Sequence, residues 1–327
     1  MPGEAPASDA AMTWFQRLLL LTIVLTFVLV MIGGTVRATG SGLGCPDWPM
    51  CHGEIIPPAE KHTLIEFSHR TAAGIVGVVF LGVTYFAFKT ERRNTLVFWL
   101  AFSAGLLLVA QIILGGITVK KELPPEIVAA HLGTAMAFIG VLIVTATVSL
   151  ARSRAAPVVR SALDSNYTRL AIATAAVAFA TLILGSYISN TEAALACDGW
   201  PLCSGTAVPR GDSAVGLHWL HRLVAGMLGV MLLATIWAAF DEHRGRALKV
   251  MTLLAGVVYI TQALVGAANI WTELREDVVV THLTLAALLW CILVAASAIS
   301  FYSPAEARIA AESANARREG KAAEWAR

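Results

Sequence analysis

The sequence predicts an all-α integral membrane protein, with eight transmembrane helices arranged as two tandem, pseudo-symmetric four-helix bundles. Three observations lead to this fold class: an apolar composition, eight apolar runs of membrane-crossing length, and motifs that recur between the two halves. The 327 residues are 57% hydrophobic and 14% charged, with a mean hydropathy of +0.69. A net charge of +2 gives no reason to expect a nucleic-acid partner, so the expected surroundings are a lipid bilayer.

Each apolar run is long enough to cross the hydrocarbon core, which takes about 20 helical residues. Backbone groups in lipid must be satisfied within the segment, so we expect every run to be α-helical. The predicted helices cover residues 15–36, 66–88, 95–118, 127–150, 168–189, 217–240, 247–270 and 278–301. They divide the chain into an N-terminal four-helix unit (1–150), a linker (151–167), a C-terminal four-helix unit (168–301) and a tail (302–327).

The distribution of Lys and Arg predicts the orientation, because cytoplasmic segments carry the excess of positive charge. One side receives 16 of the 24 basic residues, including those of the linker and the tail. We therefore expect both termini in the cytoplasm, with the tail a short helix or disordered. Two loops with paired cysteines then lie on the extracytoplasmic side, where disulfides persist.

Motifs of the first half recur in the second half at a nearly constant offset. The stretch TGSGLGCPDWPMCHG (39–53) aligns with LACDGWPLCSG (195–205) at an offset of 152 residues, and His-Arg pairs align at the same offset. Gln, Gly, Glu and His residues align further along at an offset of 151. Such an ordered recurrence indicates a tandem repeat. An even number of helices per half predicts parallel halves related by an axis along the membrane normal.

Four histidines occupy equivalent positions near the outer ends of the even-numbered helices. Ionisable residues inside a bilayer are costly and suggest a function. Two imidazoles that face each other across a four-helix unit can ligate a heme iron axially. The four candidates are His69 and His131 in the first half, and His221 and His282 in the second.

Two other interpretations of these histidines remain open. Each could be a hydrogen-bonded packing residue, or each pair could bind zinc with Glu66 or His218 as a third ligand. An apolar lining rich in glycine favours a flat macrocycle, although small residues also allow close helix packing. The lining glycines are Gly74, Gly77, Gly82, Gly133 and Gly140.

The halves differ at Glu66, whose repeat partner is His218. Glu66 precedes His69 by three residues, so the two share a helix face, and a carboxylate at the edge of an apolar site can exchange protons. Alternatively, Glu66 faces water and stabilises the helix N-terminus by its charge. His218 is also a second candidate ligand in place of His221, although the repeat favours His221.

Arg70 and Arg222 directly follow histidines near the outer mouth of each unit. A guanidinium there can pair with heme propionates. It can equally extend towards lipid headgroups.

The motifs EFSHR, AAHLG, HRLVAG and THLTLA, together with the two Cys stretches, resemble the heme A synthase family of bacterial and mitochondrial membranes. The resemblance covers nearly the whole chain, from the first helix to the eighth. It implies an enzyme that oxidises the C8 methyl group of heme O to a formyl group, which yields heme A for cytochrome oxidase. It also implies a bacterial cytoplasmic membrane location, with heme O synthase and an unidentified electron donor as partners.

By position, the resemblance implies that His69 and His131 hold the substrate heme O. In the second half, His221 and His282 would hold a permanent heme b. Glu66 matches the family's essential acidic residue, and the four loop cysteines match two outer-loop pairs, Cys45–Cys51 and Cys197–Cys203.

The paired cysteines then have two interpretations. A disulfide between Cys45 and Cys51 closes a ring of about seven residues and is worth about 2 kcal/mol by loop entropy. Alternatively, the pair exchanges redox state or transiently holds the incoming heme. A metal site is not expected, because each loop has only two thiols.

Two other functions compete with the synthase. A diheme b-type electron-transfer cytochrome explains the four histidines, but explains neither the presence of Glu66 in one half only nor the Cys loops. A heme-handling protein would need an open pathway and a partner surface, which the sequence does not reveal.

In the synthase, two histidines on the iron of the substrate heme would leave no open coordination position for oxygen. Either one histidine leaves the iron during turnover, or the oxidant forms elsewhere.

Overall fold

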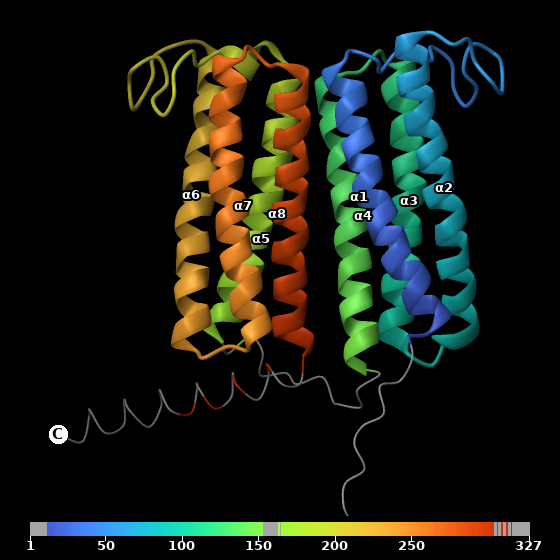
Figure 1. Ribbon diagram of the computed structural model, residues 1–327, viewed down its shortest axis with the longest axis vertical. Coiled ribbons are helices and arrows are strands. Elements are labelled where there is room, and N and C mark those ends of the chain that lie inside the picture. The colour runs from blue at the N-terminus through green and yellow to red at the C-terminus, as the bar shows by residue number, and fades with distance from the viewer. Residues whose placement is uncertain are drawn as a thin grey trace, which may run out of the picture.

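The computed structural model describes residues 12–152 and 165–303, together with Leu163, Glu306, Ile309, Glu312 and Asn315. Most of the predicted linker and tail therefore lies outside the described residues. In the described part, eight long α-helices and one short 3-10 helix make up the fold (Figure 1). They are α1 (Trp14–Ala38), α2 (Lys61–Thr90), α3 (Thr95–Lys120), α4 (Pro125–Arg152), α5 (Asn166–Ser189), η2 (Glu192–Leu195), α6 (Ser213–Asp241), α7 (Arg246–Trp271) and α8 (Glu276–Tyr302).

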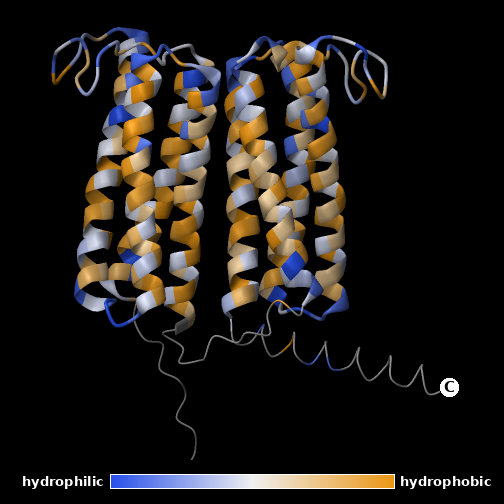
Figure 2. Ribbon diagram, turned by 180° about the vertical axis from the view of Figure 1, so that it is seen from behind, coloured by the Kyte–Doolittle hydropathy of each residue, from blue (hydrophilic) through white to orange (hydrophobic). Residues whose placement is uncertain are grey.

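All eight α-helices are long and apolar enough to cross a membrane. Hydrophobic residues predominate along the helices, whereas hydrophilic residues gather at the two ends (Figure 2). Large apolar side chains point outwards; Val78 and Val230, which occupy equivalent repeat positions, are 70% and 67% exposed. Such surfaces are expected against lipid rather than water. The predicted fold class is confirmed, and the chain is a multi-pass membrane protein.

Helices α2 and α6 begin earlier than their apolar runs predict. They start at Lys61 and Ser213 rather than at residues 66 and 217. Polar residues, Lys61 to Thr63, form the added turn of α2, whereas the added turn of α6 follows Asp212, whose side chain accepts a hydrogen bond from the Val215 N–H. At 1.5 Å per residue, the 30 residues of α2 extend about 45 Å, more than the ~30 Å hydrocarbon core. Glu66 consequently lies in the second turn of α2 and not at its N-terminus.

The interface between the halves is formed by α1, α4, α5 and α8. At its centre, the indole Nε1 of Trp290 donates a hydrogen bond to the carbonyl of Met136, at 3.0 Å. Gly140 makes room for the Trp290 ring, and Gly133 makes room for Ile183. Of the two interpretations left open for these two glycines, close packing between the halves is the one that their contacts support. Gly82 likewise packs against Leu18.

The two Cys loops lie at one end of the molecule, and α1 begins and α8 ends at the opposite end (Figure 1). The repeat extends to backbone conformation at the loop end. Glu122 and Leu123, between α3 and α4, have φ of 58° and 61°, and their repeat partners Glu273 and Leu274, between α7 and α8, have 50° and 65°. The two halves therefore resemble each other in their turns as well as in their helices.

A buried ion cluster lies at the opposite end of the second half. Arg244 is 1% exposed and pairs with Glu242 at 3.2 Å and with Glu306 at 3.4 Å. Its guanidinium also lies over the ring of Tyr167, 5.2 Å from the centroid. Glu306 accepts a further hydrogen bond from the backbone N–H of Gly245. These contacts attach Glu306 to the turn between α6 and α7.

Candidate functional site

The structure places the four candidate histidines at one depth, near the end that carries the Cys loops. Two of them are the ninth residues of α2 and α6, and two are the seventh residues of α4 and α8. Within each half the two rings are close enough to interact electrostatically. The pairs are His69 with His131, and His221 with His282.

Each of these rings packs against a glycine on the preceding helix. A Cβ added to Gly33, Gly115, Gly185 or Gly266 would lie 3.1, 3.2, 2.9 or 3.0 Å from the Cε1 atom of His69, His131, His221 or His282, respectively. Carbon atoms in favourable contact are about 3.5–4.0 Å apart. Only glycine therefore leaves the rings where they are. This role was not predicted from the sequence, although all four glycines obey the repeat offset.

The Nδ1 atoms of all four histidines are buried and have no hydrogen-bond partner among the residues that the structure describes. Most buried polar atoms are paired, so four equivalent exceptions point to a ligand or a function. The amide nitrogen of Gln111 lies 3.2 Å from Nε2 of His131, and that of Gln262 lies 3.4 Å from Nε2 of His282. The interpretation of these residues as fully hydrogen-bonded packing histidines does not fit this geometry.

A zinc site would need a third ligand in each half. Residues 12–152 and 165–303 contain no group of three or more His, Cys, Asp or Glu side chains placed to hold a metal ion. The two proposed third ligands, Glu66 and His218, bond to other partners: Arg70 and the carbonyl of Ala193. The zinc alternative is therefore wrong for the described residues.

Glu66 is buried, with 5% of its surface exposed, so the interpretation that it faces water is wrong. Its Oε1 accepts a hydrogen bond from Nε of Arg70 at 2.9 Å. Its repeat partner His218 is also buried, and its Nδ1 lies 2.9 Å from the carbonyl of Ala193, which belongs to η2. His218 therefore ties η2 to α6, whereas His221 shares the glycine contact of the other three histidines.

The structure joins Cys45 to Cys51 and Cys197 to Cys203 by disulfides, each with a Cα–Cα distance of 4.7 Å. All four cysteines are at most 2% exposed. The first Cys loop reaches α3, because the Trp48 ring packs on Gly116, 3.2 Å from an added Cβ. The loop thus extends over the mouth of the first half.

Arg70 and Arg222 hold the two Cys loops through the same three backbone positions. Arg70 donates to the carbonyls of Cys45, Asp47 and Met50, each at 2.8 Å. With its bond to Glu66, four of its five N–H groups are engaged. A propionate contact, which remains a prediction, would have to use the fifth or replace a loop carbonyl.

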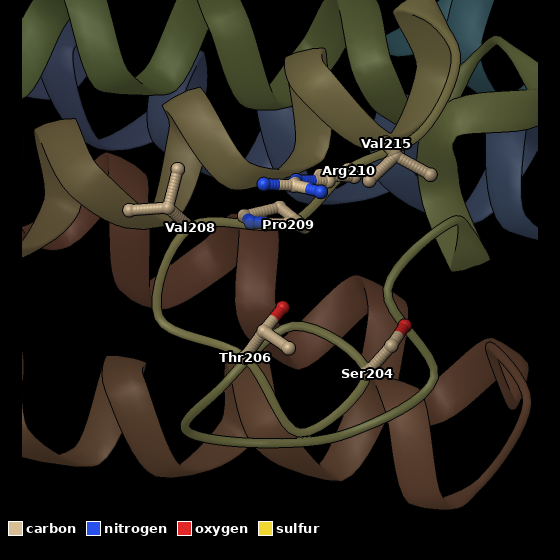
Figure 3. Close-up of a pocket in the computed structure, with 6 residues that line it drawn as sticks. All are labelled: Ser204, Thr206, Val208, Pro209, Arg210 and Val215. Carbon is tan, nitrogen blue, oxygen red and sulfur yellow. The ribbon is translucent and has the colours of Figure 1, made fainter.

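A separate cavity of about 310 Å³ lies beside the second Cys loop. It opens between this loop and the start of α6 (Figure 3), and none of the four histidines lines it. It is lined by Ser204, Thr206, Val208, Pro209, Arg210 and Val215.

Comparisons with known proteins agree with this architecture over most of the chain. A family model, COX15-CtaA, described as "Cytochrome oxidase assembly protein", matches residues 16–294. A heme A synthase of Shouchella clausii is 33% identical over 79% of this chain and 87% of its own length. One of Alkalihalophilus pseudofirmus is 30% identical over 84% and 93%, and one of Shewanella oneidensis 28% identical over 86% and 94%. With the family model covering the region from α1 to α8, this chain belongs to the heme A synthase family.

Proposed function

We propose that this protein is a heme A synthase, an oxidoreductase that converts the C8 methyl group of heme O to a formyl group. The observation that carries the proposal is the fourfold histidine arrangement. Each half presents two histidines from its second and fourth helices, with a glycine behind each ring and a buried Nδ1 that has no hydrogen-bond partner among the described residues. These residues fit a heme, whose iron the two histidines of each half would ligate. Bound heme supplies a redox-active iron, and heme O also supplies the methyl group that is oxidised.

In this proposal the two halves have different roles: the first binds the substrate heme and the second binds a heme cofactor. His69 and His131 would hold the substrate heme O, and His221 and His282 would hold a permanent heme b. Glu66 supports this division, because the second half has His218 at that position and no equivalent carboxylate.

Glu66 is the proposed acid–base residue of the first half. Its Oε1 is held by Arg70, and its Oε2 accepts no hydrogen bond from the described residues. A buried carboxylate with one oxygen fixed and one free is suited to hold or pass a proton at Oε2.

The proposed setting is a bacterial cytoplasmic membrane, with both termini in the cytoplasm and both Cys loops outside. Heme O synthase supplies the substrate in this proposal. An electron donor, for which the chain offers no identifying feature, exchanges electrons through the second half.

The test is to express the chain in cells that produce heme O and to separate the extracted hemes by chromatography. The intact chain is expected to yield heme A. Glu66→Gln is expected to retain a b-type absorption spectrum while heme A formation falls. Glu60→Gln is the matched control, because Glu60 is exposed and its side chain makes no capping bond at α2.

The competing function is a diheme electron carrier without chemistry on its heme. That function is favoured if the intact chain yields no heme A although heme O and reductant are both present. Normal conversion by Glu66→Gln would instead remove the acid–base role of Glu66 and leave the synthase assignment standing.

A further inference from the structure

The first Cys loop, Arg70 and Glu66 form one continuous set of contacts. The three carbonyls that accept from Arg70 belong to Cys45, Asp47 and Met50, and all three lie within the ring closed by the Cys45–Cys51 disulfide. The remaining Nε donates to Glu66 at 2.9 Å. The disulfide ring and the carboxylate are thus joined by a single guanidinium.

The second half repeats the loop contacts but lacks the carboxylate. Arg222 donates to the carbonyls of Cys197, Gly199 and Leu202, at 3.2, 2.6 and 3.1 Å. The position equivalent to Glu66 is occupied by His218, which bonds to Ala193 instead. The contacts between the arginine and the loop carbonyls are therefore common to both halves. Among the described residues, only in the first half does this arginine also donate a hydrogen bond to a buried carboxylate.

The geometry of the guanidinium makes this connection rigid. The group is planar, and its N–H directions are fixed relative to one another. Three carbonyls that hold Nη1 and Nη2 therefore also set the direction of Nε–H. The Arg70 and Glu66 side chains are only 16% and 7% exposed, so the contact is little weakened by water. The disulfide restricts the ring that carries the three acceptors.

We propose that Arg70 is a positioning residue for Glu66, and that the Cys45–Cys51 disulfide acts on the first site by holding Arg70 in place. This inference rests on the proposed acid–base role of Glu66. It assigns the disulfide an effect on Oε1 of Glu66 through Arg70, with no thiol chemistry on the heme and no change in the oxidation state of the cysteines.

The first arm of the test measures coupling between substitutions. Arg70→Lys replaces the planar guanidinium by a single ammonium group, which cannot donate to three carbonyls and a carboxylate in the same geometry. Heme A formation is expected to fall about 10- to 100-fold, the range for loss of a charge-assisted hydrogen bond. Combined with Glu66→Gln, it is expected to fall no further than with Glu66→Gln alone.

Arg222→Lys is the matched variant, because it weakens the equivalent contacts between arginine and loop carbonyls in the half without the carboxylate. Its effect on heme A formation is expected to multiply with that of Glu66→Gln. Equal behaviour of the two arginine variants towards Glu66→Gln would overturn the proposal.

The second arm of the test is an infrared measurement and does not depend on catalytic turnover. The infrared band of the Glu66 carboxylate is identified in the purified protein by its absence from Glu66→Gln. Arg70→Lys and the double substitution Cys45→Ser/Cys51→Ser are each expected to shift this band, and their combination is expected to shift it no further. Cys197→Ser/Cys203→Ser is expected to leave the band in place.

An unshifted band in Cys45→Ser/Cys51→Ser would overturn the proposal, including in the case that Arg70→Lys fails to accumulate in the membrane. Loss of heme A formation in Cys45→Ser/Cys51→Ser with an unshifted band would point to cysteines that act directly on heme. If the unaltered chain makes no heme A, the proposed function fails, while the infrared arm still decides whether Arg70 positions Glu66.

Discussion

Gly266→Ala tests whether a glycine sets the position of His282, a proposed heme ligand. The added Cβ would lie 3.0 Å from Cε1 of His282, 3.6 Å from Nδ1 and 3.8 Å from Nε2. To reach an ordinary contact of about 3.5 Å, the ring must move by about 0.5 Å. Metal–ligand distances tolerate only about 0.2 Å, so a ring displaced this far would no longer present its nitrogen to a bound heme iron in the same place.

Two opposing contributions set the expected change in the free energy of unfolding. Overpacking costs about 1–3 kcal/mol, and alanine favours a helix over glycine by about 1 kcal/mol. The free energy of unfolding should therefore change by less than about 2 kcal/mol. Heme binding needs the ring in its original place, so the part of the overpacking cost that the heme-free chain relieves by moving the ring is subtracted from heme affinity instead. At most, 1–3 kcal/mol corresponds to about 5- to 150-fold weaker binding.

The assay is titration of the purified chain with heme b, followed by absorption of the low-spin heme, with thermal unfolding measured in parallel. Gly256→Ala is the control on the same helix, ten residues away, where the nearest atom is the terminal Cδ1 of Ile236. That flexible side chain can rotate aside, so heme affinity should be retained. Unchanged heme affinity in Gly266→Ala would refute the positioning role of this glycine.

Three further predictions concern the ends of the molecule. Arg244→Met removes the cation between two buried carboxylates and should lower the free energy of unfolding by about 3–5 kcal/mol; an unchanged thermal midpoint would contradict this. Cys197→Ser opens the second disulfide ring and should increase proteolysis of that loop about 30-fold, which corresponds to about 2 kcal/mol; equal cleavage rates would contradict it. Backbone N–H groups of Gly53 and His52 lower the pKa of Asp47, so its stabilisation of the first loop is complete above its ordinary pKa of about 3.9 and is lost as the pH falls through the lowered value. Reduction of the first-loop disulfide by a phosphine should accelerate below that pH, and Asp47→Asn should abolish this pH dependence.

The helices were predictable because a bilayer allows few alternatives. A long apolar run must satisfy its own backbone hydrogen bonds, so all eight spans follow from hydropathy. The starts of α2 and α6 were not predictable in this way, because the polar turn at Lys61 and the Asp212 cap before Ser213 both lie outside the apolar runs. Hydropathy therefore predicts which residues cross the bilayer, but it does not predict how far a helix continues beyond it.

The parts of the candidate site that occur in both repeats were predictable from the sequence. The roles of residues that depend on contacts with distant segments of the chain were not. The four histidines follow from the repeat, whereas the choice between packing and lining for Gly133 and Gly140 depends on Ile183 and Trp290 in the other half. Glu66 has His69 at i+3 and Arg70 at i+4, and both spacings allow contact. The structure pairs it with Arg70, whose orientation is set by a loop about 20 residues earlier in the chain.

The division of labour between the halves is tested most directly by the hemes retained in two matched variants, His69→Ala and His221→Ala. In cells that produce heme O, His69→Ala is expected to keep heme b and to form no heme A. His221→Ala is expected to lose heme b from the purified chain. Loss of heme b in His69→Ala together with its retention in His221→Ala would contradict the assignment of the two sites.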